Sequence, residues 1–266
     1  VFGNTTPTSP CTWDLAVTVA TMSITGGYAS TVTLTVDLSI SSGATFDAGS
    51  SAMLDLNGRA LAVTGDWLVG DMRTTSTVAG STVVFTGGGV SKIKRLTAGP
   101  ARFNNLVINK LAAAGVMETL LSDLEVRGNF TVLSGSHTAG SHYQYFHQNI
   151  VLANGYLDSS LSTTVIAGSS PQRFYTTGGG DATALANLYV QTSSTFTMPE
   201  VPVGIFIATQ PSTTLVFDSL GTALPVTSLV LNGQAAGTRQ TIRSSSDGTR
   251  GKMTAVFSDV SFTAVK

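Results

Sequence analysis

The sequence predicts an all-β protein, a parallel β-helix or β-solenoid whose rungs (single turns of the chain around the axis) take about 20 residues each. Three observations lead to this prediction. The 266 residues include 39 Thr, 30 Ser and 28 Gly, whereas Lys and Glu together number eight, so good helix formers are scarce among the polar residues. Apolar and small polar residues alternate with a period of two. Short motifs recur along the chain in the same order.

Alternation is clearest in residues 30–40, where Val, Leu and Ile occupy one face and Thr, Ser and Asp the other. That pattern is typical of half-buried strands. Glycine or Asn-Gly breaks separate the strands from one another. Residues 112–121 have a locally helical composition, but Gly115 lies among them, and we expect a turn followed by a strand. Further strands are expected at 16–20, 53–56, 61–63, 82–85, 106–108, 124–126, 129–132, 149–152, 163–166, 188–190, 215–217, 229–231 and 253–257.

Internal repetition distinguishes a solenoid from a hairpin-based sandwich. Leu106, Leu188 and Leu229 each follow a polar residue and begin a Leu-x-aliphatic motif, and they are 82 and 41 residues apart. A spacing of 41 divides into two rungs of about 20. Residues 82–87 are echoed by 163–168, and residues 61–67 by 124–130. A coil of parallel strands needs such a period, because each rung buries its apolar side only against its neighbours.

The domain organisation follows from these patterns. Residues 1–14 form a Pro- and Thr-rich lead-in, and residues 15–266 form the solenoid. The final alternating strand has no polar cap, so we expect the solenoid to continue beyond Lys266 in a parent chain. Gly65 to Val84 spans 19 residues, whereas the similar stretch from Gly128 to Val165 spans 37, which predicts an insertion at about 136–160. Insertions in solenoids often carry recognition.

The predicted insertion contains the candidate site for a ligand or partner: His137, His142, Tyr143, Tyr145 and His147. The spacing of the histidines places His137 and His147 on one side of a strand and His142 on the other, so three-way metal binding requires a bent loop. Three interpretations remain open: local packing of an extra rung, an aromatic and imidazole patch that contacts sugar or a neighbouring subunit, and a transition-metal site. We expect the contact patch rather than a metal, and no cofactor.

The carboxylates are scattered, and we expect no catalytic residue. β-Helix enzymes that degrade polysaccharides need clustered carboxylates on adjacent rungs for Ca²⁺ binding or acid–base chemistry. Here Asp55, Asp66 and Asp71 fall on neighbouring rungs, as do Asp123 and Glu125, but each suits a turn or an edge. The commonest role of Asp in a turn is to accept a backbone hydrogen bond.

Charge and hydropathy exclude two classes of partner. The net charge of −1 and a pI near 6.3 offer no electrostatic footprint for nucleic acid. No run of about 18 apolar residues exists, so no membrane-spanning segment is expected. One basic cluster comprises Lys92, Lys94, Arg95 and Arg102. We interpret it as a solvated edge, with attraction to an acidic glycan or partner as the alternative.

Several motifs resemble the repeats of large bacterial surface and secreted β-helix proteins, and are similar to adhesin-like repeats and to the rungs of bacteriophage fibres and spikes. They lie at 44–50, 54–58, 61–67, 78–87, 103–106 and 229–266, the last containing Ile242-Arg243-Ser244-Ser245-Ser246-Asp247-Gly248-Thr249. The resemblance implies a long extracellular rod used for display, adhesion or assembly. It supplies no catalytic residues.

The sequence therefore predicts a non-enzymatic structural module of a bacterial surface or filament protein, extracellular or on the cell surface, that acts in spacing, adhesion or self-assembly. The expected partners are other copies or flanking domains, packed end to end or laterally, because open strand edges template further pairing. Surface glycans are a further expected partner. The alternative is a virion fibre, spike or capsid-decoration protein, and a polysaccharide-degrading enzyme ranks third.

Overall fold

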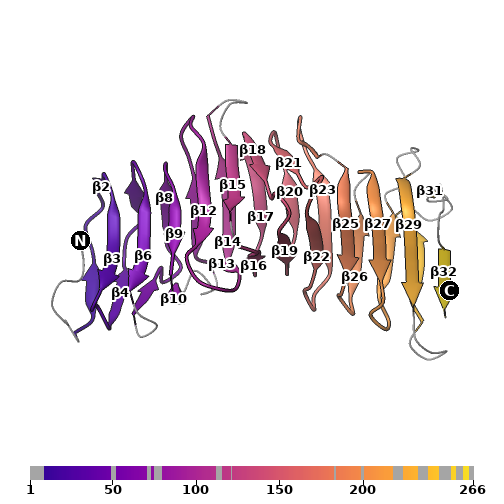
Figure 1. Cartoon of the computed structure of the whole chain (residues 1–266), viewed down its shortest axis with the longest axis horizontal. Helices are drawn as coiled ribbons and strands as arrows, with labels where there is room; N and C mark the ends of the chain where they lie inside the picture. The colour runs from indigo at the N-terminus through magenta and orange to yellow at the C-terminus, as the bar shows by residue number, and fades with distance from the viewer. Residues whose placement is uncertain are drawn as a thin grey trace.

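The structure, a computed structural model, is a β-solenoid in which the chain coils about nine times around one long axis (Figure 1). It describes residues 9–48, 52–70, 73–74, 80–111, 116–120, 122–182, 184–198, 201–217, 224–232, 239–245, 253–255 and 260–263. These residues contain 32 strands and no helix, and the strands pair in parallel from one coil to the next. The predicted fold class is confirmed. None of the described residues lies in a helix long and apolar enough to cross a membrane.

Two sheets form two sides of the solenoid. Sheet 1 contains β2 (Thr18–Val19), β5 (Leu38–Ile40), β8 (Ala60–Val63), β11 (Thr82–Phe85), β14 (Asn105–Asn109), β17 (Phe130–Ser134), β20 (Ile150–Leu152), β23 (Gln172–Thr176), β26 (Thr195–Met198), β28 (Thr214–Phe217) and β30 (Thr241–Ser244). Sheet 2 contains β3 (Met22–Gly26), β6 (Ala44–Ala48), β9 (Trp67–Val69), β12 (Ser91–Arg95), β15 (Val116–Leu120), β18 (Ser136–Thr138), β21 (Tyr156–Asp158) and β24 (Asp181–Ala182).

On the third side, two sheets follow one another along the solenoid. Sheet 3 covers the N-terminal coils with β1 (Cys11–Trp13), β4 (Thr31–Leu34), β7 (Met53–Asp55) and β10 (Arg73–Thr74). Sheet 4 follows with β13 (Ala101–Phe103), β16 (Leu124–Val126), β19 (Tyr143–Phe146), β22 (Thr163–Ile166), β25 (Leu185–Val190), β27 (Val203–Ala208), β29 (Leu224–Asn232), β31 (Met253–Ala255) and β32 (Val260–Thr263). From β25 to β31 the described strands alternate between sheets 4 and 1, so these C-terminal coils have two strands each.

The coils are slightly longer than predicted, about 23 residues rather than about 20. In sheet 1, Leu38, Leu61, Val83 and Leu106 lie opposite one another on successive strands, 23, 22 and 23 residues apart. Three short strands with a corner after each account for this length, since a strand residue advances the chain only about 3.3 Å.

The core is a continuous column of apolar side chains enclosed by the sheets. Inward and outward positions alternate along nearly every strand, as in β11, where Val83 and Phe85 are fully buried. Aromatic side chains connect successive coils: the ring centroid of Trp67 lies 4.8 Å from that of Phe46 and 5.5 Å from that of Phe103. Each coil is thus stabilised by its neighbours, since the side chains of one coil fill space against the next.

The predicted domain boundaries shift in two places. Residues 1–8 of the predicted lead-in lie outside the described residues, but Cys11–Trp13 of that lead-in form β1, which pairs with β4. The segment expected as an insertion, 136–160, supplies β18, β19, β20 and β21, all paired in register within the sheets. It is part of the stack and does not project from it.

An insertion was predicted because two segments were compared that lie on different sides of the solenoid. Gly65 to Val84 runs from β9 in sheet 2 to β11 in sheet 1, whereas Gly128 to Val165 runs from β17 in sheet 1 to β22 in sheet 4. The second segment contains six strands and the first three, so the additional 18 residues are most of an ordinary coil.

Candidate functional site

Four of the five predicted contact residues come together on the outer surface of sheet 4, and the fifth does not. His142, Tyr143, Tyr145 and His147 lie in or next to β19 with their side chains outside the solenoid. They adjoin Arg102 of β13 and Asp123, Glu125 and Arg127 in or next to β16. We call these eight residues the Glu125 face. The parallel register fixes their order, because Arg102 lies opposite Glu125, and Glu125 lies opposite Tyr145.

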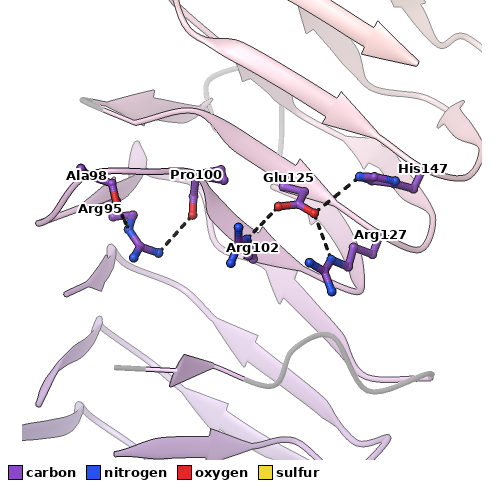
Figure 2. Close-up of polar contacts among 7 residues, drawn as sticks. All are labelled: Arg95, Ala98, Pro100, Arg102, Glu125, Arg127 and His147. Atoms are coloured by element: carbon purple, nitrogen blue, oxygen red, sulfur yellow. Dashed lines mark hydrogen bonds and ion pairs between the residues drawn. The ribbon is translucent and has the colours of Figure 1, made fainter. Parts of the chain in front are cut away.

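Glu125 is the centre of this face (Figure 2). Its carboxylate accepts hydrogen bonds from Arg102 Nε at 2.8 Å and from Arg127 Nε at 3.0 Å. His147 Nε2 lies 3.5 Å from the same carboxylate. The side chain of Glu125 is only 13% exposed, whereas those of Arg102 and Arg127 are 50% and 47% exposed. The arginines therefore cover the carboxylate and still present guanidinium edges to solvent.

The electrostatics of Glu125 follow from this geometry. Burial by itself raises the pKa of a carboxyl group, but the hydrogen bonds and positive charges of Arg127 and Arg102 outweigh burial and hold the pKa of Glu125 below its ordinary value. Glu125 is thus ionised near neutral pH, and the group of two arginines and one carboxylate carries a net positive charge.

Two stacked tyrosines border the charged group. The rings of Tyr143 and Tyr145 are nearly parallel, with an interplanar angle of 16° and centroids 6.0 Å apart. Asp123 Oδ1 accepts a hydrogen bond from the backbone N–H of Tyr143 at 3.0 Å and lies 3.8 Å from His142 Nδ1. Burial, with the nearby negative charge of Asp123, raises the pKa of Tyr145, so its hydroxyl stays protonated and can donate a hydrogen bond.

His137 was expected in the contact patch, but it faces the core and is completely buried. Its ring packs against Phe130, with centroids 5.3 Å apart, and its Nε2 lies 2.9 Å from Gln144 Oε1. It cannot contact a ligand or partner on the surface of the folded chain. The expected pairing of His137 with His147 on one side is also wrong, because the corner between β18 and β19 resets the alternation.

The predicted basic cluster is divided between two sides of the solenoid. Lys92 and Lys94 share the outer face of β12 in sheet 2, as the alternation predicted, whereas Arg102 lies in sheet 4. Arg95 turns toward its own corner, where Nε donates to the carbonyl of Ala98 and Nη1 to the carbonyl of Pro100 (Figure 2). Only Arg102 of this cluster takes part in the Glu125 face.

Two of the remaining candidate carboxylates, Asp55 and Asp66, accept hydrogen bonds from backbone N–H groups. Asp55 Oδ1 accepts a hydrogen bond from the N–H of Asn57, which is the turn role predicted for it. Asp66 Oδ1 accepts one from the N–H of Lys92 in the next coil. Asp71 lies outside the described residues. Among the described residues, no group of three or more His, Cys, Asp or Glu side chains is placed to hold a metal ion.

The sequence reasoning missed Arg102 and Arg127 as site residues and considered Glu125 only as one of several scattered carboxylates. The signal was present, because alternation places Glu125 outward in Leu124-Glu125-Val126, and Tyr145 follows it after 20 residues. Chemically, the face can bind an anionic group through its guanidinium edges and can pack a flat, weakly polar surface against the tyrosines.

Comparison with known proteins adds no further guidance: no protein-family model matches the chain, and no curated protein or solved structure matches it.

Proposed function

We propose that the chain is a non-enzymatic structural module of an extracellular bacterial surface or filament protein, and that its solenoid acts in spacing, adhesion and self-assembly. The observation that supports this most strongly is the parallel stacking of coil on coil along one axis, which makes the described part of the chain an extended body (Figure 1). Such a body separates what is attached to its two ends and offers repeated surfaces along its sides.

Self-assembly is supported by the terminal strands. In the part of the chain that the structure describes, β2 and β3 each pair on one side only, with β5 and β6. Unpaired strand edges template the addition of further strands. The partners proposed here are therefore other copies or flanking domains that stack end to end on the solenoid.

Adhesion is supported by the Glu125 face. Its half-exposed guanidinium groups and stacked tyrosines are flat, partly charged and fixed by strand register, all of which suit contact with another surface. In this proposal, the Glu125 face contacts an acidic surface glycan or a neighbouring subunit. The residues in contact would be Arg102, Arg127, Tyr143 and Tyr145.

One edge substitution tests the assembly. Met22 N donates to Gly43 O in the next coil, so the N–H of Ser23 faces the opposite, outer edge of β3. Ser23→Pro removes that outer donor and leaves the β3–β6 hydrogen bonds in place. Sedimentation velocity should show concentration-dependent oligomers for the wild type and for the control Ser23→Ala, and monomer for Ser23→Pro. A wild type that stays monomeric at all concentrations contradicts end-to-end assembly.

Two further outcomes bear on the wider proposal. A closed three-fold assembly would favour a virion fibre over a surface or filament protein. Turnover of any acidic or neutral polysaccharide on a panel would contradict the non-enzymatic role.

A further inference from the structure

A groove lies at the corner between sheets 1 and 2, on a different side of the solenoid from the Glu125 face. Its volume is about 410 Å³, and it crosses three successive coils. The first coil contributes Ser134 to Ser136, the second Asn154 to Tyr156, and the third Gly179 and Asp181. A volume in this range matches a small-molecule site rather than a protein interface.

Glycines make this corner hollow. Gly135 is the only residue between β17 and β18. Its φ is +76°, a value that residues other than glycine rarely adopt. Gly155 occupies the equivalent place one coil later, and a Cβ there would lie 2.2 Å from Val132 Cγ1. Glycine, which has no side chain, thus stands at this corner in each of the three coils, as Gly135, Gly155 and Gly179.

The wall of the groove is an ordered row of three different side chains. Ser136, Tyr156 and Asp181 lie opposite one another on β18, β21 and β24. Their side chains project outward at the strand spacing of about 4.8 Å, because the alternate residues, His137 and Leu157, face the core. A hydroxyl, an aromatic ring and a carboxylate therefore follow one another along the groove.

The chemistry of this row differs from that of the Glu125 face. Tyr156 is 38% exposed, so part of its ring surface is open to a ligand. Asp181 is exposed and supplies an acceptor, and Asn154 adds a carboxamide whose oxygen already accepts a hydrogen bond from the N–H of Gly179 at 3.1 Å. Asp181 is the only charged residue among the eight that line the groove, and its charge disfavours anionic ligands.

We infer that this groove binds a neutral saccharide. One face of a sugar ring is made of C–H groups and packs on an aromatic ring, while its edge carries hydroxyls that donate to a carboxylate and bond with hydroxyl and amide groups. Tyr156 supplies the ring, Asp181 the acceptor, and Ser136 and Asn154 the flanking polar groups. The site follows the solenoid axis, so an oligosaccharide rather than a single sugar ring would lie across the three coils. This inference goes beyond the proposed structural role and does not depend on end-to-end assembly.

Calorimetric titration of the full chain with neutral hexasaccharides of glucose, mannose and N-acetylglucosamine tests the inference. At least one should bind. In the Arg102→Gln/Arg127→Gln background, which removes the guanidinium groups of the Glu125 face, a hexamer of galacturonic acid should bind about tenfold more weakly or not at all. Tyr156→Ala should weaken binding about tenfold or more, and Tyr156→Phe, which keeps the ring, should weaken it less. Tyr189→Ala is the matched control, since Tyr189 is a partly exposed tyrosine of β25 in sheet 4 that lies outside both the groove and the Glu125 face.

Asp181→Asn provides a second variant in case Tyr156→Ala fails to fold, which circular dichroism would reveal. It should weaken binding of the neutral hexasaccharide about tenfold and reduce the discrimination against the galacturonic acid hexamer. No binding by any neutral hexasaccharide at millimolar concentration overturns the inference. An equal loss in Tyr189→Ala, or preferred binding of the acidic hexamer in the Arg102→Gln/Arg127→Gln background, overturns it as well.

Discussion

His137 Nε2 lies 2.9 Å from Gln144 Oε1 inside the solenoid, where both side chains are fully buried. Gln144 Nε2 donates to the hydroxyls of Ser159 and Ser162 at 3.0 and 3.1 Å. Gln144 Oε1 is therefore the acceptor for His137, which places the proton of the neutral imidazole on Nε2. His137 Nδ1 has no hydrogen-bond partner among the described residues. A polar layer thus spans two adjacent coils of the stack and is incompletely paired.

This layer should make the solenoid acid-sensitive. Burial lowers the pKa of His137 from 6.5 to about 4, although the hydrogen bond to Gln144 and the charge of Asp158 act in the opposite direction. Between those two pH values the unfolded chain binds more protons than the folded chain, so the free energy of unfolding decreases as the pH falls from 6.5 toward 4. The full effect is about 3 kcal/mol.

Denaturant unfolding between pH 7 and pH 4 measures this effect. The double variant His137→Leu/Gln144→Leu removes both partners and should have a flatter dependence on pH than the wild type. His142→Ala, which removes an imidazole on the surface, should retain the dependence of the wild type. Equal slopes for the wild type and the double variant would show that His137 is not the titrating group.

Lys110 is a buried residue that carries an ionisable side chain. Its side chain is fully buried, and its Nζ donates to the carbonyl of Gly89 and to the hydroxyl of Ser91. Burial lowers its pKa, and the charge of Asp66 only partly opposes this. The folded chain therefore binds fewer protons than the unfolded chain at pH values up to 10.5, so stability rises as the pH approaches 10.5.

Lys110→Met should remove that rise and should stabilise the chain at pH 7 by about 1 kcal/mol, since a buried ammonium is replaced by an apolar side chain of similar length. The carbonyl of Gly89 can still bond to water, because Gly89 is exposed. Thermal unfolding at pH 7 and pH 9.5 measures both effects. A variant less stable than the wild type at pH 7 would show that the hydrogen bonds of Lys110 outweigh its burial.

Gly155 tests the close packing of neighbouring coils. An added Cβ would lie 2.2 Å from Val132 Cγ1 of the preceding coil, and the coils would have to separate to accommodate it. Gly155→Ala should therefore destabilise the chain by about 1–3 kcal/mol, measured as a lower unfolding midpoint. The control is Gly89→Ala, where nothing lies within 4 Å of the added carbon. If both variants unfold at the same midpoint as the wild type, the coils are not packed this closely.

Glu125 offers a direct test of the charge on its face. Glu125→Gln removes the acceptor charge between Arg102 and Arg127 and leaves both guanidinium groups uncompensated. Stability should change little, because the arginines are half exposed and pairs of this kind contribute weakly. The variant should elute from a heparin column at higher salt than Asp47→Asn, which removes one negative charge from β6 of sheet 2. Identical elution would show that the Glu125 face does not bind polyanions.

The fold could be predicted from the sequence because most strands are short and alternate between inward and outward residues. Val83 and Phe85 are inward and Glu125 and Tyr145 outward, as period two requires. The echo from Leu188 to Leu229 is genuine: both lie in sheet 4, and Phe206 stands between them at spacings of 18 and 23 residues. Two coils therefore make up the 41 residues.

Other echoes related different sides of the solenoid. Leu106 lies in sheet 1 but Leu188 in sheet 4, and Val83 lies in sheet 1 but Val165 in sheet 4. The same unit, a short alternating strand with a glycine corner, serves every side, so similarity between two segments does not reveal which side they occupy. For the same reason the sequence could not place His137 inside, nor bring Arg102, Glu125 and His147 together. Those contacts depend on where each corner resets the alternation.

Cross-linking measures the parallel stacking most directly. In the Cys11→Ser background, cysteines at Ala62 and Val84 lie opposite each other on the outer faces of β8 and β11, in adjacent coils. Mild oxidation should join them, because neighbouring parallel strands are about 4.8 Å apart. Cysteines at Ala62 and Val107 are two coils apart and should stay reduced, since Val107 lies opposite Val84 and not Ala62. Efficient joining of Ala62 to Val107, with none of Ala62 to Val84, would contradict the coil-on-coil register.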